Sequence, residues 1–186
     1  MLLFATGNRH KFDEVSKVLA EFGIELGQEK MDLVEIPSDS LEEIALHKAK
    51  QAFAKLKQPL IAEDTGFFME AYKGFPGTNP KWVVERIGLE GILKLASGKS
   101  RKGCFQTVIC FIESPESYRF FEGKMHGKLS KKIINPNADT MPYNKIFIPD
   151  GDKRVLAEMS EKEKLSFLQR TIATRKLGKW LKEKSH

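Results

Sequence analysis

Apolar residues in the first half of the chain alternate between short continuous runs and stripes with helical spacing. The run Leu2-Leu3-Phe4-Ala5 is typical of a buried strand. The stripe that follows predicts a helix ending at Gly23. A capping box, Ser40 with Glu43, predicts the start of a second helix that ends before Pro59. Strands that alternate with helices in this way predict an α/β fold with a largely buried sheet.

The rest of the chain predicts further strands and a helical end. Leu60-Ile61-Ala62 predicts a short buried strand that ends at Glu63-Asp64-Thr65-Gly66, and Phe67 to Ala71 is expected to continue extended. The runs Gly103 to Glu113 and Tyr118 to Lys128 predict a hairpin, and the capping box Ser160–Glu163 predicts one long C-terminal helix. The sequence has no internal repeat and no linker that would divide it. We therefore expect one domain over residues 1–186, with room for two lobes.

The composition is that of a soluble globular protein, with 41% hydrophobic and 30% charged residues. An excess of 31 basic over 25 acidic residues gives a net charge of +6, much of it near the C-terminus. This balance suits polyanionic partners such as nucleotides or nucleic acid. Nucleic-acid binding by the last helix is disfavoured, because no exposed aromatic residues are interleaved with its basic ones.

Cysteine spacing and the absence of long apolar runs predict a cytoplasmic protein. Cys104 and Cys110 lie in one predicted strand, which separates them by about 20 Å and prevents a disulfide within it. No apolar run has membrane-spanning length, and Met1 leads directly into a strand without a signal-peptide pattern. The histidines lack zinc-ligand spacing and are expected to be structural or surface residues: His10, His47, His126 and His186.

The segment between the first predicted strand and helix has the form of an anion-binding turn. Thr6-Gly7-Asn8 ends the strand, and Lys11 lies on the first turn of the helix. Unpaired backbone N–H groups and the positive end of the helix dipole favour a phosphate at such a position. The structural alternative is that Gly7 only makes the turn and Asn8 only caps the helix.

Three charged residues occupy positions that suggest a site. Lys48 falls on the apolar stripe of the second helix, so it must either extend to solvent or meet a buried anion. Asp64 ends a buried strand, at the edge where open α/β sheets bind ligands, and Glu35 ends an extended segment. Two converging carboxylates suit Mg²⁺, with phosphates and water as its other ligands. The alternatives are a turn aspartate and a solvated glutamate. Because strand side chains alternate, Glu63 should point away from Asp64.

Several short motifs, read in order, cover essentially the whole chain. They are Thr6-Gly7-Asn8 with Lys11, Asp64-Thr65-Gly66, Gly74-Phe75-Pro76-Gly77, Ile146-Phe147-Ile148-Pro149-Asp150-Gly151 and Ala157-Glu158-Met159-Ser160. Together they resemble the inosine triphosphatase family, the noncanonical purine nucleoside triphosphate pyrophosphatases distantly related to the Maf proteins. The resemblance implies an elongated mixed sheet flanked by helices in two lobes around a nucleotide cleft, commonly in a homodimer.

The resemblance also implies roles for individual residues. Thr6, Gly7, Asn8, Lys11, Lys48, Thr65 and Lys81 would bind the phosphate end of the substrate; Glu35 and Asp64 would hold Mg²⁺; Asp64, Lys11 and Lys48 would form the catalytic set. The implied reaction is attack of water on the α-phosphorus of triphosphates such as ITP, dITP or XTP. Its products are pyrophosphate and a nucleoside monophosphate.

The end that would bind the base departs from the family pattern. Met141-Pro142-Tyr143-Asn144-Lys145 replaces Phe-Gly-aromatic-Asp-Pro, and Leu168-Gln169-Arg170 replaces Ser-His-Arg. Lys164 is kept, but Leu165 stands where the family has Asn. The implied base contacts are Tyr143, Asn144, Lys164, Gln169 and Arg170. Base selectivity is therefore expected to be altered, and a non-catalytic nucleotide-binding descendant is the alternative.

Overall fold

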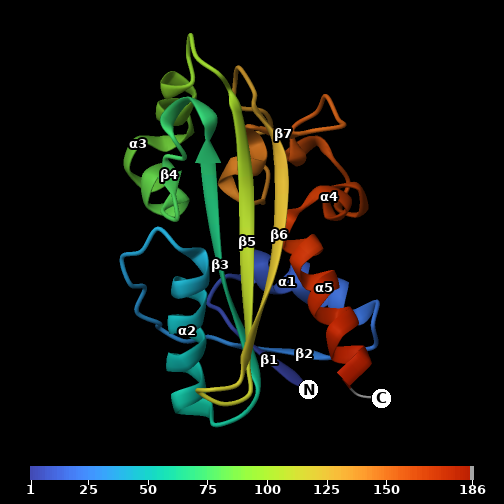
Figure 1. Cartoon of the computed structure of the whole chain (residues 1–186). Helices are drawn as coiled ribbons and strands as arrows, with labels where there is room; N and C mark the ends of the chain where they lie inside the picture. The colour runs from blue at the N-terminus through green and yellow to red at the C-terminus, as the bar shows by residue number, and fades with distance from the viewer. Residues whose placement is uncertain (185–186) are drawn as a thin grey trace. The chain divides into compact units, whose positions relative to one another are not determined.

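The protein has a mixed α/β fold, as predicted (Figure 1). The computed structural model describes residues 1–184, so the predicted surface position of His186 lies outside the described residues. Within those residues the strands form one seven-stranded sheet in the order β2-β1-β3-β5-β6-β7, with β4 paired to β3. Five α-helices accompany the sheet in the described part of the chain.

Contacts group the chain into two compact units. Unit 1 comprises Met1–Thr65, Thr107–Gly123 and the chain from Gln169 on, and unit 2 comprises Gly66–Gln106 and Lys124–Leu168. Three long strands contribute residues to both units: β3 (Leu60–Met69), β5 (Lys102–Ile112) and β6 (Tyr118–Leu129). Every polar contact of the candidate site described below lies within unit 1.

Unit 1 is built around β1, which pairs in parallel with both β2 and β3. Besides its parts of the long strands, unit 1 contains β1 (Leu2–Ala5), α1 (Arg9–Ala20), β2 (Leu26–Glu29), α2 (Leu41–Leu56) and α5 (Gln169–Lys184). Helices α1 and α5 lie against each other on one side of the strands, and α2 lies on the other side (Figure 1). Val15, Val18 and Leu19 of the predicted α1 stripe are fully buried, which confirms the helical periodicity.

Unit 2 has its own aromatic core. Its helices and short strands are β4 (Pro76–Gly77), α3 (Pro80–Leu95), β7 (Phe147–Pro149) and α4 (Glu161–Phe167), with short 3₁₀ turns at Glu70–Tyr72, Pro142–Lys145 and Leu156–Glu158. The rings of Phe67 and Phe105 stack with centroids 4.4 Å apart, and Tyr143 and Phe147 pack against both. Helix α3 is interrupted at Gly88, which has a left-handed φ of 67°.

Strand β3 is continuous through the segment where the sequence predicts a strand end. The predicted strand ends at Glu63-Asp64-Thr65-Gly66, but β3 continues to Met69, so the prediction that Asp64 ends a strand is wrong. The extension is stabilised by β4, which pairs antiparallel with Phe67 and Phe68. By contrast, β1 pairs with β3 only as far as Ile61. Asp64 therefore lies beyond the end of the neighbouring strand β1, although it is inside its own.

The predicted single C-terminal helix is also wrong, because it is broken at Leu168. The backbone of this residue has ψ 132°, which ends α4 and separates it from α5. Leu168 is buried in the core of unit 2, whereas the chain from Gln169 on belongs to unit 1. The break thus falls where the chain leaves one core for the other. The capping box Ser160–Glu163 is formed in both directions, as predicted.

The second predicted capping box is only half formed. Ser40 Oγ accepts the backbone N–H of Glu43 at 3.3 Å, which starts α2 at Leu41 as expected. The Glu43 carboxylate, however, accepts a hydrogen bond from Ser38 Oγ at 2.7 Å, and Ser38 Oγ accepts the backbone N–H of Ser40. Ser38 takes the place that the capping box assigns to the glutamate, because its hydroxyl can both donate and accept.

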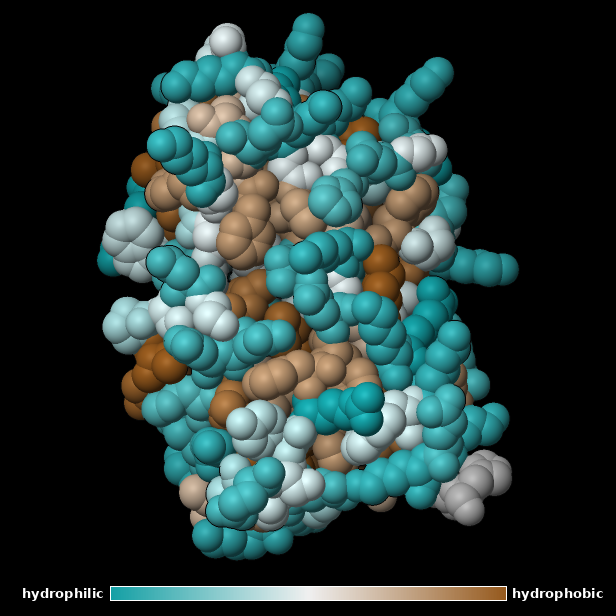
Figure 2. Space-filling view, viewed as in Figure 1, coloured by the Kyte–Doolittle hydropathy of each residue, from teal (hydrophilic) through white to brown (hydrophobic). Residues whose placement is uncertain are grey.

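The surface, the two thiols and the lengths of the helices bear on the predicted location. Hydrophilic side chains cover most of the face shown in Figure 2, while apolar ones gather over the long strands. Neither Cys104 nor Cys110 forms a disulfide among the described residues, and burial raises the pKa of the Cys110 thiol to about 12. In the described part of the chain, every helix is too short or too polar to cross a membrane.

Gly123→Ala tests the close approach of β6 and α5 in unit 1. A Cβ at Gly123 would lie 2.0 Å from the carbonyl oxygen of Gln169 and 2.7 Å from the backbone nitrogen of Ala173. Because backbone atoms would have to move, we expect the free energy of unfolding to fall by about 3 kcal/mol. The control is Gly7→Ala, since a Cβ at Gly7 meets no atom within 4 Å. Urea denaturation compares the two variants; equal stability would contradict this packing.

Candidate functional site

The turn between β1 and α1 is held by its own polar groups. The backbone N–H of Thr6 donates to the carbonyl of Glu29 at 2.9 Å, which ties the turn to β2. Thr6 Oγ1 accepts the N–H of Asn8, and Asn8 Oδ1 accepts the N–H of Lys11, both at 3.1 Å. Asn8 is thus the N-cap of α1. The capping role that was the structural alternative for Asn8 is therefore present, and the positive end of a twelve-residue helix faces this turn.

Gly7 has no structural requirement for glycine. Its φ lies outside the left-handed region, so any L-residue could adopt its backbone conformation. A Cβ added there would meet no atom within 4 Å, and the residue is exposed. The alternative that Gly7 only makes a tight turn therefore has no support in its backbone. What glycine provides is open space above the turn, where a ligand can approach the backbone.

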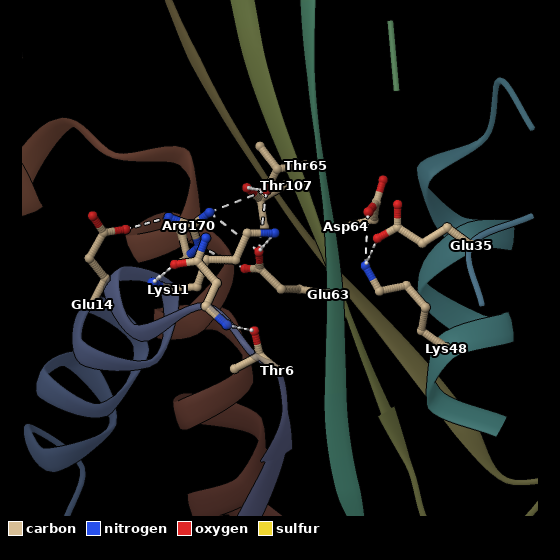
Figure 3. A network of polar contacts seen from close by, with 11 residues as sticks. Thr6, Lys11, Glu14, Glu35, Lys48, Glu63, Asp64, Thr65, Thr107 and Arg170 are labelled. Atoms are coloured by element: carbon tan, nitrogen blue, oxygen red, sulfur yellow. Dashed lines mark hydrogen bonds and ion pairs between the residues drawn. The ribbon is translucent and has the colours of Figure 1, made fainter. Parts of the chain in front are cut away.

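Glu35, Lys48 and Asp64 form one charged group, called here the Asp64 cluster (Figure 3). Lys48 Nζ donates to Glu35 Oε1 at 2.9 Å and to Asp64 Oδ1 at 3.1 Å. The side chains of Lys48 and Asp64 are 11% and 9% exposed, whereas that of Glu35 is 64% exposed. Lys48 therefore meets buried anion charge, the second of the two outcomes that its position on the α2 stripe allowed.

Burial and charge set the protonation behaviour of the Asp64 cluster. Burial raises the pKa of Asp64, and the negative charge of Glu35 adds to this against the attraction of Lys48 and Lys11. Burial opposes the Lys48 charge, but the attraction and hydrogen bonds of Asp64 and Glu35 outweigh it and raise the pKa of Lys48. Lys48 is therefore a cation at neutral pH. The charge of Lys11, which pairs with Glu63, also acts on the Asp64 carboxylate.

One oxygen of the Asp64 cluster is available for a ligand. Among the described residues, Asp64 Oδ2 is buried and has no hydrogen-bond partner. A buried carboxylate oxygen without a partner is costly, which is the condition that a cation or a water would relieve. Residues 1–184 contain no group of three or more His, Cys, Asp or Glu side chains placed to hold a metal. A pair of carboxylates nevertheless fits Mg²⁺, which takes few protein ligands when phosphates and water complete its shell.

Glu63 points to the opposite side of β3, toward α1 and α5 (Figure 3). Its carboxylate accepts hydrogen bonds from Lys11 Nζ at 2.8 Å and from Arg170 Nε at 2.7 Å. Arg170 Nη1 also binds the Glu14 carboxylate. We call these four residues the Glu63 cluster. The alternation of neighbouring side chains along β3, predicted for Glu63 and Asp64, is confirmed.

The Glu63 cluster is fully buried at its centre. Burial opposes ionisation of Glu63, but the charges of Arg170 and Lys11 outweigh it and lower its pKa to about 2. Arg170 is 2% exposed, and its Nη2 also donates to Thr65 Oγ1 at 3.4 Å. The Thr65 hydroxyl in turn shares a 2.7 Å hydrogen bond with that of Thr107 on β5. Four elements of unit 1 thus meet at one network.

The charged side chains of unit 1 that were predicted to bind substrate or metal fall into two groups. Lys48, Glu35 and Asp64 lie together on the α2 side of β3, while Lys11 and Arg170 lie together on the α1 and α5 side (Figure 3). From the sequence we expect these charged side chains to surround a single triphosphate. The structure has two clusters that share the strand between them and are coupled by the charge of Lys11 on Asp64.

Four predicted substrate contacts belong to unit 2. The Lys81 side chain is 88% exposed and lies 3.9 Å from Glu85, and Lys164 is partly exposed on α4. Tyr143 is 7% exposed in the aromatic core, and its hydroxyl donates to the Pro80 carbonyl at 3.1 Å. The Tyr143 ring packs in the aromatic core of unit 2. Asn144 is buried and donates from Nδ2 to Thr140 Oγ1 at 2.7 Å.

Sequence reasoning missed Glu14, Thr107 and the role of Glu63. Glu14 is 7% exposed on the buried face of α1, directly before Val15. The criterion that singled out Lys48, a charge on an apolar helical stripe, would also have found Glu14. Thr107 carries no comparable signal, because threonine is ordinary in strands.

Lys48→Met tests the burial of the Asp64 cluster. Removing the ammonium leaves the buried Asp64 carboxylate without its cation, so we expect the free energy of unfolding to fall by about 3 kcal/mol. The matched control is Lys81→Met, which removes a mostly exposed ion pair and should leave stability nearly unchanged. Urea denaturation measures both variants at pH 7. A Lys48→Met protein as stable as the control would show that the cluster is not buried in solution.

Comparison with known proteins supports the resemblance drawn from the motifs. The profile of the Ham1 family matches residues 2–180. The dITP/XTP pyrophosphatase of Methanopyrus kandleri is 39% identical over 182 residues, which are 97% of this chain and 96% of that protein. The protein of the same name from Thermococcus kodakarensis is 37% identical and covers 98% of this chain and 97% of its own length.

Solved structures share the fold. A HAM1 protein from Coxiella burnetii aligns with a TM-score of 0.82 at 22% identity, over 98% of this chain and 100% of that chain. The Ham1 protein of Staphylococcus aureus aligns with a TM-score of 0.75 at 20% identity, over 98% of both chains. Profile, relatives and fold agree along nearly the whole length. The chain therefore belongs to the Ham1 family, which confirms the predicted family resemblance.

Proposed function

We propose that this protein hydrolyses noncanonical purine nucleoside triphosphates, such as ITP, dITP and XTP, to the monophosphate and pyrophosphate. The observation that carries the proposal is the Asp64 cluster, in which a buried lysine binds two carboxylates and one Asp64 oxygen is left without a partner. Relatives named dITP/XTP pyrophosphatase, aligned over nearly their full length, supply the substrate class.

The phosphate chain would bind at the turn before α1. The backbone N–H groups of this turn and the positive end of the α1 dipole favour an anion there. Open space above Gly7 lets phosphate oxygens approach the backbone, and the Lys11 side chain, 18% exposed, is within one helical turn. Lys48 and Lys11 would together neutralise the charge that builds up on the leaving pyrophosphate.

Glu35 and Asp64 would hold Mg²⁺, with substrate phosphates and water as its remaining ligands. When bound, Mg²⁺ supplies positive charge that polarises the phosphate oxygens. The unpartnered Oδ2 of Asp64 would accept a hydrogen bond from water and orient it toward the α-phosphorus. As the water oxygen forms the new bond to phosphorus, one of its protons would pass to Asp64 Oδ2. The bond to the bridging oxygen would break, and pyrophosphate would leave with that electron pair.

The base would be recognised by groups that differ from the family pattern. Among the described residues, Gln169 Oε1 is buried and has no hydrogen-bond partner, so it offers an acceptor to a donor on the base. Such a buried acceptor discriminates strongly against ligands that cannot pair with it. The non-catalytic alternative has no comparable support, since Lys48, Glu35 and Asp64 are all kept and in contact.

A panel of nucleoside triphosphates tests the proposed reaction directly. We expect pyrophosphate release from ITP, dITP or XTP in the presence of Mg²⁺, loss of activity in EDTA, and recovery when Mg²⁺ is added in excess. Asp64→Asn should lower kcat by at least about a hundredfold, because it removes the carboxylate charge that holds the metal and orients water. The control is the exposed loop variant Asp139→Asn. If no triphosphate in the panel releases pyrophosphate with Mg²⁺, the proposal is wrong.

Gly7→Ala tests the approach of phosphate to the turn. The added methyl group meets no protein atom, so the fold should be unchanged, but it occupies the space where phosphate would lie. We expect KM for the best substrate to rise about tenfold or more, with unfolding unaffected. Steady-state kinetics measure the change. An unaltered KM would place the phosphate chain elsewhere.

A further inference from the structure

We propose that Gln51 is a positioning residue for the metal site, which acts on Glu35 through the backbone of the loop that carries it. The inference rests on the proposed function, because it concerns how the same site receives Mg²⁺. Three observations support it: the exposure of the loop, the paired hydrogen bonds of Gln51 to Val34, and the place of Gln51 one turn after Lys48 on α2.

The loop that carries Glu35 lies at the surface and has no regular structure. It connects β2 to α2; of its residues, 30–40, all of which the structure describes, none belongs to a helix or strand and none is buried. Val34, directly before Glu35, is 66% exposed, and the Glu35 side chain is 64% exposed. Burial of apolar surface therefore contributes little to the position of this carboxylate, and polar contacts must fix it.

Gln51 binds the backbone directly before Glu35 at two points. Its Oε1 accepts the N–H of Val34 at 3.0 Å, and its Nε2 donates to the carbonyl of Val34 at 2.7 Å. Since that carbonyl belongs to the peptide bond between Val34 and Glu35, the two bonds fix the peptide planes on both sides of Val34. Nε2 also donates to the His47 carbonyl at 3.4 Å, which holds the Gln51 amide against its own helix. The amide thus meets the loop in a defined orientation.

Lys48 and Gln51 hold Glu35 from the same helix but in different ways. They are three residues apart on α2 and therefore lie on the same face of it. Lys48 Nζ binds the Glu35 carboxylate itself, at 2.9 Å, and also binds Asp64. In the proposed reaction this ammonium meets the phosphates, so it cannot also fix the carboxylate. Gln51 binds only backbone, so its contact with the loop persists when a ligand engages Lys48 or the Glu35 carboxylate.

Mn²⁺ binding tests the role of Gln51 independently of catalysis. Gln51→Met nearly keeps the length of the side chain and removes both hydrogen bonds to the loop. We expect this variant to bind Mn²⁺ about tenfold more weakly than the unmodified protein, because a metal ligand has lost its outer partner. The EPR signal of free Mn²⁺ measures the affinity. The control is Gln58→Met, which changes an exposed glutamine beyond the end of α2 and should leave Mn²⁺ binding unaltered.

A double-mutant cycle shows whether Gln51 acts through Glu35. Glu35→Gln removes the charge of the ligand and should itself weaken Mn²⁺ binding. In that background Gln51→Met should cause a further loss of less than about twofold, since the residue that it positions no longer holds the metal. Equal Mn²⁺ affinity of Gln51→Met and the unmodified protein would overturn the proposal. The same loss in both backgrounds, or no Mn²⁺ binding by the unmodified protein, would also overturn it.

Hydrolysis, measured in parallel, separates this proposal from the proposed function. The Mg²⁺ concentration that gives half the maximal rate should rise about tenfold in Gln51→Met, while kcat at saturating Mg²⁺ stays within about twofold. If the unmodified protein hydrolyses no nucleotide but the Mn²⁺ results are as expected, only the proposed reaction is wrong. If it hydrolyses nucleotides and Gln51→Met binds Mn²⁺ normally, only the role of Gln51 is wrong.

Discussion

Two neighbouring carboxylates, Glu63 and Asp64, are buried on opposite faces of one strand, and each is stable there only because cations meet it. An unpaired buried carboxylate costs several kcal/mol, so neither could stay ionised in the folded chain alone. The cations come from different helices: Lys48 from α2, Lys11 from α1 and Arg170 from α5. The charges can therefore pair only when these helices pack on β3. The segment Glu63-Asp64 of β3 thus determines where the three helices pack in unit 1 and where the charged groups of the candidate site lie.

If the proposed function is right, this arrangement would hold the phosphate-binding lysines in place before the phosphate arrives. Lysines that must face a triphosphate repel one another, and the protein's own carboxylates hold them in place in its absence. The two faces differ in what they leave open. On the α2 side, Glu35 is largely exposed and Asp64 keeps an unused oxygen. On the other side, Glu14 and Glu63 are buried with Arg170, so only Lys11 extends outward. We infer that the first face takes part in the chemistry and that the second supports it.

Much of this was predictable from sequence, for reasons that individual residues make clear. Lys48 was recognised because a charge interrupts an apolar stripe, and the opposite directions of Glu63 and Asp64 follow from strand geometry. The continuity of β3 through Asp64 was not, and its last residues pair with β4 in the turn that follows. The break at Leu168 was not predictable either, because it falls where the chain passes from the core of unit 2 to unit 1. Glu14, 156 residues from Arg170 in sequence, gains its partner only in the folded chain. The predicted homodimer and the remaining site residues stay predictions.

The most direct test of the Asp64 cluster as the metal-binding centre is a crystal structure with Mn²⁺ in place of Mg²⁺ and a triphosphate whose α,β-bridging oxygen is replaced by a non-hydrolysable group. Anomalous scattering locates the manganese without reference to the protein coordinates. The account predicts an anomalous peak bonded to Asp64, with Glu35 in or next to its coordination shell and Lys48 turned toward the phosphates. A peak remote from Asp64, with Lys48 still bound to both carboxylates, would contradict it.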